Sequence, residues 1–193
     1  MSTDQGELIT PPRTLAEIDA IIRSRSEMIT RRDQIKEIVE PPLLPACLDL
    51  YDKNIRTLSS SANKKDLEVG HAYISIDYET LSPENQKIAQ KFGGPIVSDE
   101  RRMLFIEIPV DKNSTLDSID SSARQIAVAF QKQPMTWAPT FTVESLKQMY
   151  GISSEEHEYD DPKVWEGEGL FFDAENSIFY LSEEHYQKVN EQQ

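Results

Sequence analysis

Apolar residues in the first part of the chain recur at helical spacing, which predicts a long N-terminal helix. The members of this stripe are Ile18, Ile21, Met28, Ile35 and Val39. Thr14 and Glu17 stand in the order of a capping box, in which each side chain satisfies a backbone N–H of the first turn. Two prolines, at positions 41 and 42, would end the helix, because neither can continue its hydrogen-bond ladder. Residues 1–12 lack such a pattern and are expected to form a flexible tail.

Further along the chain, two stretches have the pattern of strands. Residues 71–78 alternate between apolar and more polar side chains, as in a strand with one face more buried than the other. Residues 103–110 are apolar on both faces except for Glu107, which predicts a central strand. Helices are predicted after Ser82, which stands at an N-cap position, and over residues 116–130, where the apolar residues form one stripe.

The C-terminal part combines a helix, an acidic loop and a β-hairpin. Thr142 is expected to cap a short helix, and Ser182 a terminal one. Between them, residues 170–172 and 178–181 have the composition of hairpin strands. Helices and strands mix without regular βαβ alternation. The predicted fold class is therefore α+β, with a mixed or antiparallel sheet packed by helices.

Acidic residues gather near the C-terminus and mark off a subdomain there. The formal net charge of the 193 residues is −14, and residues 153–193 contain twelve Asp and Glu against two Lys, which is −10 of that total. We expect a main α+β domain over residues 13–152 and an acidic subdomain over residues 153–193 packed on it. A chain of this charge repels phosphate backbones, so no direct nucleic-acid partner is expected.

The chain has the features expected of a cytoplasmic protein. Its start has neither the basic nor the apolar region of a secretory signal, and its longest apolar runs are too short to span a bilayer, so no membrane association is expected. Cys47 is the only cysteine, and its apolar neighbours predict a buried and unreactive thiol.

The sequence contains none of the common catalytic motifs. It has no glycine-rich nucleotide loop, no nucleophile elbow, no zinc-protease helix and no Cys-x-x-Cys pair. Ser-Glu-Glu-His occurs twice, at residues 154–157 and 182–185, and imidazoles with carboxylates could bind a metal. A serine followed by acids is, however, typical of a helix N-terminus, which is the interpretation we favour. We therefore predict no catalytic residue, no cofactor and no metal site.

Residues 55–58 are predicted to form a short strand. The polar segment that follows this strand is a candidate anion site. Its hydroxyl and ammonium groups come from Ser59, Ser60, Ser61, Lys64 and Lys65. Such groups, together with backbone amides, can surround a phosphate. The glycines of a true phosphate loop are missing, so a solvated connection is the alternative.

Seven side chains are candidates for contact with a protein partner: Arg25, Arg32, Trp137, Glu155, Glu156, Asp160 and Asp161. The two arginines lie on the apolar stripe of the predicted N-terminal helix, which could dock on a partner. Trp137 stands between two prolines, and it is either an exposed binding residue or part of the core. The four acids belong to the acidic loop.

These observations favour a non-enzymatic cytoplasmic protein that binds or regulates another protein. One alternative is a small enzyme or ligand-binding domain for an anionic small molecule, which would use the segment from Ser59 to Lys65. Another is an acidic nucleic-acid mimic that inhibits a basic protein through the C-terminal section.

Overall fold

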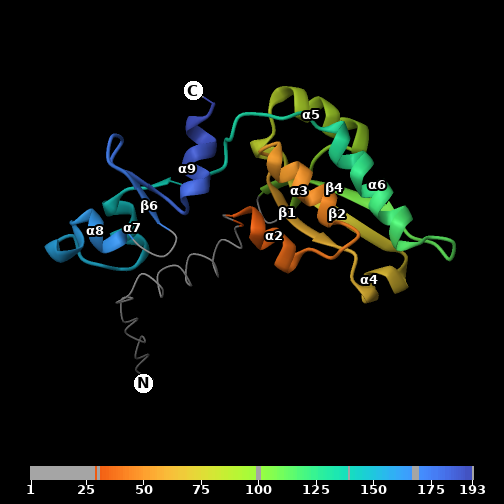
Figure 1. Cartoon of the computed structure of the whole chain (residues 1–193), viewed down its shortest axis with the longest axis horizontal. Coiled ribbons are helices and arrows are strands. Elements are labelled where there is room, and N and C mark those ends of the chain that lie inside the picture. The colour runs from red at the N-terminus through yellow and green to blue at the C-terminus, as the bar shows by residue number, and fades with distance from the viewer. Residues whose placement is uncertain (1–28, 30, 99–100, 139, 167–169, 193) are drawn as a thin grey trace, which may run out of the picture. The chain divides into compact units, whose positions relative to one another are not determined.

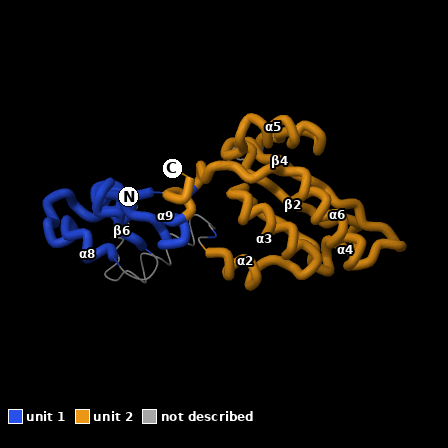
Figure 2. The backbone as a smooth tube through the Cα atoms, turned by 45° about the horizontal axis from the view of Figure 1, so that its top comes forward, with its two compact units in different colours: residues 1–30, 138–187 blue, residues 31–137, 188–193 orange. Residues whose placement is uncertain are grey.

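The chain forms two compact units, seen in a computed structural model that describes residues 29, 31–98, 101–138, 140–166 and 170–192. Unit 2 comprises residues 31–137 and 188–193, and unit 1 comprises residues 1–30 and 138–187 (Figure 2). The expected boundary after residue 152 falls inside unit 1. The described helices include none that is long and apolar enough to cross a membrane.

Unit 2 is an antiparallel four-stranded sheet with helices, in agreement with the predicted α+β class. The elements in chain order are α2 (Arg32–Ile38), α3 (Leu44–Asp52), β1 (Thr57–Ser61), α4 (Lys64–Val69), β2 (His71–Asp77), α5 (Pro83–Ala89), β3 (Ile96–Ser98), β4 (Arg101–Pro109) and α6 (Leu116–Ala129), with 3-10 turns over Tyr78–Thr80 and Gln90–Phe92. The strands lie in the order β1-β2-β4-β3. The predicted central strand is confirmed, because β4 pairs with β2 on one side and with β3 on the other.

One face of this sheet forms the core of unit 2. Alternate residues of the two central strands are buried there: Ala72, Ile74, Ile76, Leu104, Ile106 and Ile108. The helices α3 and α6 pack against each other over this face (Figure 1). Because side chains alternate along a strand, Tyr73, Ser75, Phe105 and Glu107 point to the opposite face.

Capping residues fix several helix ends, and those at Ser82 and Thr142 are where the sequence predicts them. The hydroxyl groups of Ser82 and Thr142 accept hydrogen bonds from the first turns of α5 and α7. Asn54, beyond the end of α3, has a φ of 60°, the left-handed conformation that asparagine tolerates better than most residues. These local signals act within four residues, so they can be identified in the sequence.

The prediction of one long N-terminal helix is wrong at its described end. Helix α2 begins only at Arg32, because Arg31 is extended with φ −134° and ψ 146°. The backbone N–H of Arg31 donates to the side chain of Gln34 at 2.8 Å, and this local bond caps the start of α2. The remaining predicted helix residues up to residue 28, including Arg25 and the capping box, lie outside the described residues, as does the predicted tail.

Strand β1 also differs from its prediction. It covers Thr57–Ser61 rather than residues 55–58, and helix α4 follows where the sequence predicts a polar connection. The side chain of Asn63 caps this helix by accepting from the N–H of Asp66 at 3.0 Å.

Unit 1 is built around a small antiparallel sheet of order β5-β7-β6. Its elements are β5 (Thr140–Phe141), α7 (Val143–Met149), a 3-10 turn (His157–Tyr159), α8 (Pro162–Trp165), β6 (Phe171–Asp173) and β7 (Ile178–Tyr180), and α9 (Glu183–Asn190) follows them. The predicted hairpin and terminal helix are therefore present. The buried cluster is Leu146, Tyr150, Ile152, Trp165, Phe179 and Leu181.

Candidate functional site

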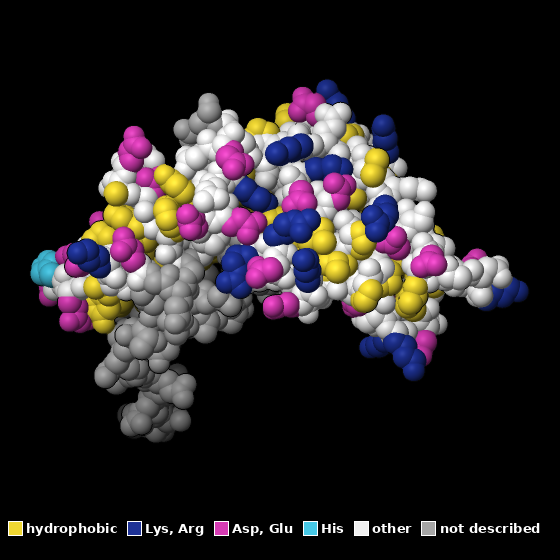
Figure 3. Space-filling view, viewed as in Figure 1, with side chains coloured by type: hydrophobic (Ala, Val, Ile, Leu, Met, Phe, Trp, Pro, Cys, Tyr) yellow, Lys and Arg dark blue, Asp and Glu magenta, His cyan; other side chains and the backbone are white. Residues whose placement is uncertain are grey.

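The two units differ strongly in charge. Unit 1 contains 17 acidic and 5 basic residues, which is −12, whereas unit 2 contains 17 and 15, which is −2. On the face drawn in Figure 3, Lys and Arg side chains are spread over unit 2 among acids, while unit 1 shows mainly acids. The acidic field of the chain therefore arises from unit 1.

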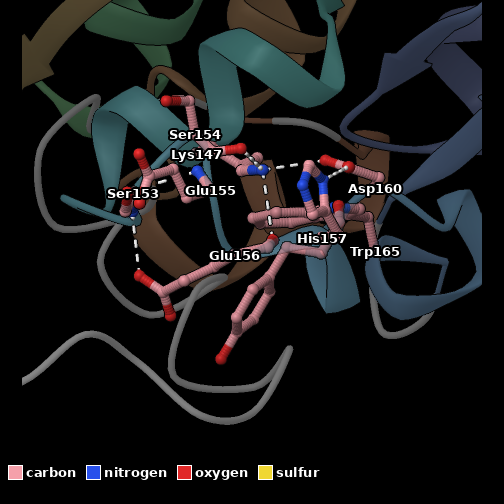
Figure 4. A network of polar contacts seen from close by, with 9 residues as sticks. Lys147, Ser153, Ser154, Glu155, Glu156, His157, Asp160 and Trp165 are labelled. Carbon is pink, nitrogen blue, oxygen red and sulfur yellow. Dashed lines mark hydrogen bonds and ion pairs between the residues drawn. The ribbon is translucent and has the colours of Figure 1, made fainter.

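A buried lysine holds the acidic loop of unit 1 in place. The ammonium of Lys147 donates to the backbone oxygens of Ser154 at 3.2 Å and Glu156 at 3.1 Å, and to Oδ1 of Asp160 at 2.8 Å (Figure 4). The other carboxylate oxygen of Asp160 lies 2.8 Å from Nδ1 of His157. The hydrogen bond from Lys147, followed by that from His157, lowers the pKa of Asp160. Asp160 is thus part of the loop's own hydrogen-bond network.

The other three acids predicted to contact a partner differ in whether their carboxylates form hydrogen bonds within unit 1. The Glu156 side chain accepts from the backbone N–H of Ser153 at 2.9 Å, and Asp161 caps α8 by accepting from the N–H of Lys163 at 3.0 Å. Glu155 is exposed, and its carboxylate makes no hydrogen bond with any residue that the structure describes. Three of the four carboxylates therefore have bonds inside unit 1, and Glu155 alone among them points outward without one.

Trp137 is part of the core and is not an exposed binding residue, which settles the two alternatives left open by the sequence. The indole is buried, and its N–H donates to the backbone oxygen of Asn54 at 2.9 Å. Tyr51 packs edge-on against it at a ring distance of 6.2 Å.

Arg32, another predicted partner contact, forms a two-pronged ion pair with Asp52 at 2.8 and 2.9 Å. The hydrogen bond from Arg32 lowers the pKa of Asp52.

The predicted anion-binding groups do not converge. Ser59 and Ser60 lie on β1, whereas Lys64 and Lys65 are exposed on α4, with Lys64 at 3.8 Å from Glu68. Ser61 donates to the carboxylate of Asp66. This carboxylate also accepts from Asn63 at 2.8 Å. A carboxylate at the centre of the segment repels an anion, which disfavours the phosphate interpretation.

Cys47 is buried, as predicted from its apolar neighbours. Burial raises the pKa of its thiol to about 11, and the carboxylate of Glu40 adds to this, while a bond to Ser60 opposes it.

Cys47 is therefore expected to react very slowly in the folded protein. Because the thiolate is the reactive form, the rate at pH 8 should be about 100-fold or more below that of the unfolded chain, whose cysteine has a pKa of about 8.5. Ellman's reagent, with and without urea, measures both rates. Equal rates would show that the thiol is accessible.

The opposite face of the unit 2 sheet carries a group of side chains that single-residue patterns do not reveal. We call it the Tyr73 face, and it comprises His71, Tyr73, Ser75, Met103, Phe105 and Glu107. The rings of Tyr73 and Phe105 are stacked, with centroids 4.8 Å apart and planes at 28°. Phe105 is 39% exposed, and Ile96, which pairs with Met103, is 50% exposed. Phe105 of this aromatic pair is therefore accessible in the middle of the sheet, and Tyr73 is half-buried beside it.

Polar groups flank this pair at one end of the face. Glu107 lies directly opposite Tyr73 in the strand register. His71 stands between two carboxylates, with Nε2 at 3.8 Å from Asp66 and Nδ1 at 4.0 Å from Glu107. The described residues nevertheless include no group of three or more ligands that could hold a metal ion.

The sequence contains a partial signal for this face. The alternation over residues 71–78 assigns His71 and Tyr73 to the side away from the core, and Glu107 interrupts the apolar run of the next long strand. The pairing of β2 with β4 brings these residues together, and no local pattern encodes it.

Comparison of the chain with protein-family models, with curated proteins and with solved structures gave no match.

Proposed function

We propose that the chain is a binding protein that engages another protein through the Tyr73 face of unit 2. The observation that supports this most directly is the stacked pair of Tyr73 and Phe105, of which Phe105 is accessible, on the side of the sheet away from α3 and α6. Large aromatic side chains contribute most of the energy in many protein interfaces, because they bury much area at low entropic cost.

The neighbours of the pair suit a contact surface. Ser75 lies opposite Phe105 and Ser61 lies opposite Tyr73, and both serines are buried, so the larger side chains beside them form the contact surface. Ile96 and Met103 extend the apolar area toward the β3 edge. An apolar centre with polar residues around it is the usual composition of a protein interface.

A purely structural role for the pair makes a different prediction. A cross-strand aromatic pair stabilises a sheet by about 0.2–1 kcal/mol, whether or not a partner exists. Truncation of Phe105 would then lower stability slightly and change nothing else.

Photo-crosslinking from the face tests the proposal. With p-benzoylphenylalanine in place of Phe105, irradiation in the native lysate should give a protein adduct of defined mass. The matched control is the same replacement of Val128, which is 73% exposed on α6. The partner so identified should bind Phe105→Ser about tenfold or more weakly than wild type, as at an interface hot spot, and Val128→Ser normally. Adducts that are identical at both positions, or unchanged affinity of Phe105→Ser, would contradict the proposal.

A further inference from the structure

We infer that the Tyr73 face receives an arginine side chain of the partner, whose guanidinium lies on the aromatic pair and bonds to Glu107. This inference rests on the proposed function and specifies the chemistry of the partner.

Glu107 is the available carboxylate at this end of the face. Its side chain is 59% exposed, and it makes no hydrogen bond with any of the residues described. The Nδ1 atom of the His71 ring lies 4.0 Å from its carboxylate. By contrast, Asp66 accepts from Ser61 and Asn63, and Asp77 on the same strand face pairs with Arg56 at 3.2 Å. A cation that reaches the face would therefore find the Glu107 carboxylate without a hydrogen bond to any described residue.

The aromatic pair offers a second contact for the guanidinium, beside the hydrogen bonds to Glu107. Side chains directly opposite each other on antiparallel strands have Cβ atoms about 5 Å apart, so Glu107 stands beside the ring of Tyr73. Phe105 is two residues from Glu107 on β4 and points to the same face. The rings have electron-rich faces, and they attract a cation that lies over them.

A guanidinium fits this combination better than an ammonium does. It is planar and weakly hydrated, so it can stack on a ring while it donates two parallel hydrogen bonds to a carboxylate. An ammonium is a compact and strongly hydrated charge, which loses more on leaving water. Charge complementarity between Glu107 and the partner therefore favours arginine.

Peptide titration of the full chain tests the inference directly. The probes are two nonapeptides of glycine and serine that differ only at the central residue, which is arginine in one and citrulline in the other. Citrulline keeps the shape of arginine but is neutral. The titration is followed by two-dimensional NMR at pH 8.

The arginine peptide should bind about tenfold more tightly than the citrulline peptide, since a charge-assisted pair and a cation–π contact are both lost. Signals of Tyr73, Phe105 and Glu107 should shift. The preference should disappear in Glu107→Gln and persist in Glu84→Gln, which changes an exposed glutamate on α5. Equal binding of the two peptides, or no binding at millimolar concentration, would overturn the inference.

Failure of the inference and failure of the proposed function can be told apart with the crosslinked partner. If Phe105→Ser loses the partner but Glu107→Gln binds it as wild type does, the face is an interface and the arginine inference is wrong. If neither variant loses affinity, the face is not the interface, and both proposals fail.

Discussion

Replacing Lys147 by methionine is expected to lower the free energy of unfolding of unit 1 by about 2–4 kcal/mol. The methionine keeps most of the buried stem but removes the ammonium. The backbone oxygens of Ser154 and Glu156 then lose a charged donor, and a hydrogen bond to a charged group contributes about 1.5–3 kcal/mol. Asp160 is half exposed and its carboxylate can be hydrated instead, so the loss of its ion pair with Lys147 adds less to the destabilisation.

The same substitution should change how stability depends on pH. Lys147, and then His157, lowers the pKa of Asp160, so the folded state holds this proton less tightly than the unfolded chain does. Such a group stabilises the fold above the ordinary aspartate pKa of about 3.9, and the contribution is lost as the pH falls through the lower folded value. Without Lys147, the pKa of Asp160 rises toward its ordinary value, and the acid-induced loss of stability becomes smaller.

Hydrogen exchange, read peptide by peptide by mass spectrometry, measures this effect within unit 1 of the full chain. Lys163→Met is the matched control, because Lys163 is an exposed lysine on α8. Protection of the segment around residues 153–161 should fall in Lys147→Met and stay unchanged in the control. Equal protection in the two variants would mean that the ammonium does not hold the loop.

Features of the fold that depend on nearby residues could be predicted from the sequence. The caps at Ser82, Thr142 and Ser182 are set by contacts within a few positions. The central strand was predictable for a related reason. A strand that is apolar on both of its faces must be buried on both, and the centre of a covered sheet is where this occurs.

Features that depend on distant residues could not be predicted. Tyr73 and Glu107 are opposite each other only because β2 pairs with β4 in one register. Lys147 resembles any surface lysine in the sequence. It is buried because the loop that follows α7 turns its backbone oxygens toward the ammonium. For the acidic loop, the sequence gives the amount of charge but not which carboxylates are bonded internally.

The predicted N-terminal helix is wrong for a different reason: the apolar pattern runs through a residue at which the backbone is extended. The apolar stripe continues past Arg31 without a break in spacing. One side chain, that of Gln34, accepts the Arg31 N–H and favours an extended residue there. Whether a helix passes through a residue such as Arg31 or begins after it is decided by about 1 kcal/mol, the usual energy of a cap, and hydrophobic periodicity does not report this difference.

A second large effect is expected in unit 2, where replacing Asn85 by alanine should cost about 3–5 kcal/mol of stability. Asn85 is fully buried at the start of α5. Its amide donates to the backbone oxygen of Gln131 and to the side chain of Gln133, both at 2.8 Å, and its oxygen accepts from the N–H of Gln131 at 2.9 Å. Alanine removes the partner of the N–H and C=O of Gln131 and one of the two donors to the Gln133 side-chain oxygen.

Gln133 extends the network, so the damage should spread beyond α5. Its side-chain oxygen accepts from the N–H of Ser82, and its amide donates to the backbone oxygen of Thr80, both at 2.8 Å. The backbone oxygen of Gln133 accepts from the side chain of Asn54 at 2.8 Å. One buried amide thus joins the segment after α6 to the end of α3 and to the turn before α5.

Two further variants separate lost hydrogen bonds from lost packing. Asn85→Asp keeps the volume but places an acceptor against the oxygens of Gln131 and Gln133, so it should destabilise unit 2 at least as much as alanine does at pH 7. Gln131→Ala removes only an exposed side chain from the same segment and should change stability by less than about 0.5 kcal/mol. Urea unfolding followed by circular dichroism gives the three values. If Asn85→Asp were as stable as wild type, the amide donor would contribute nothing, and the network would not hold these segments together.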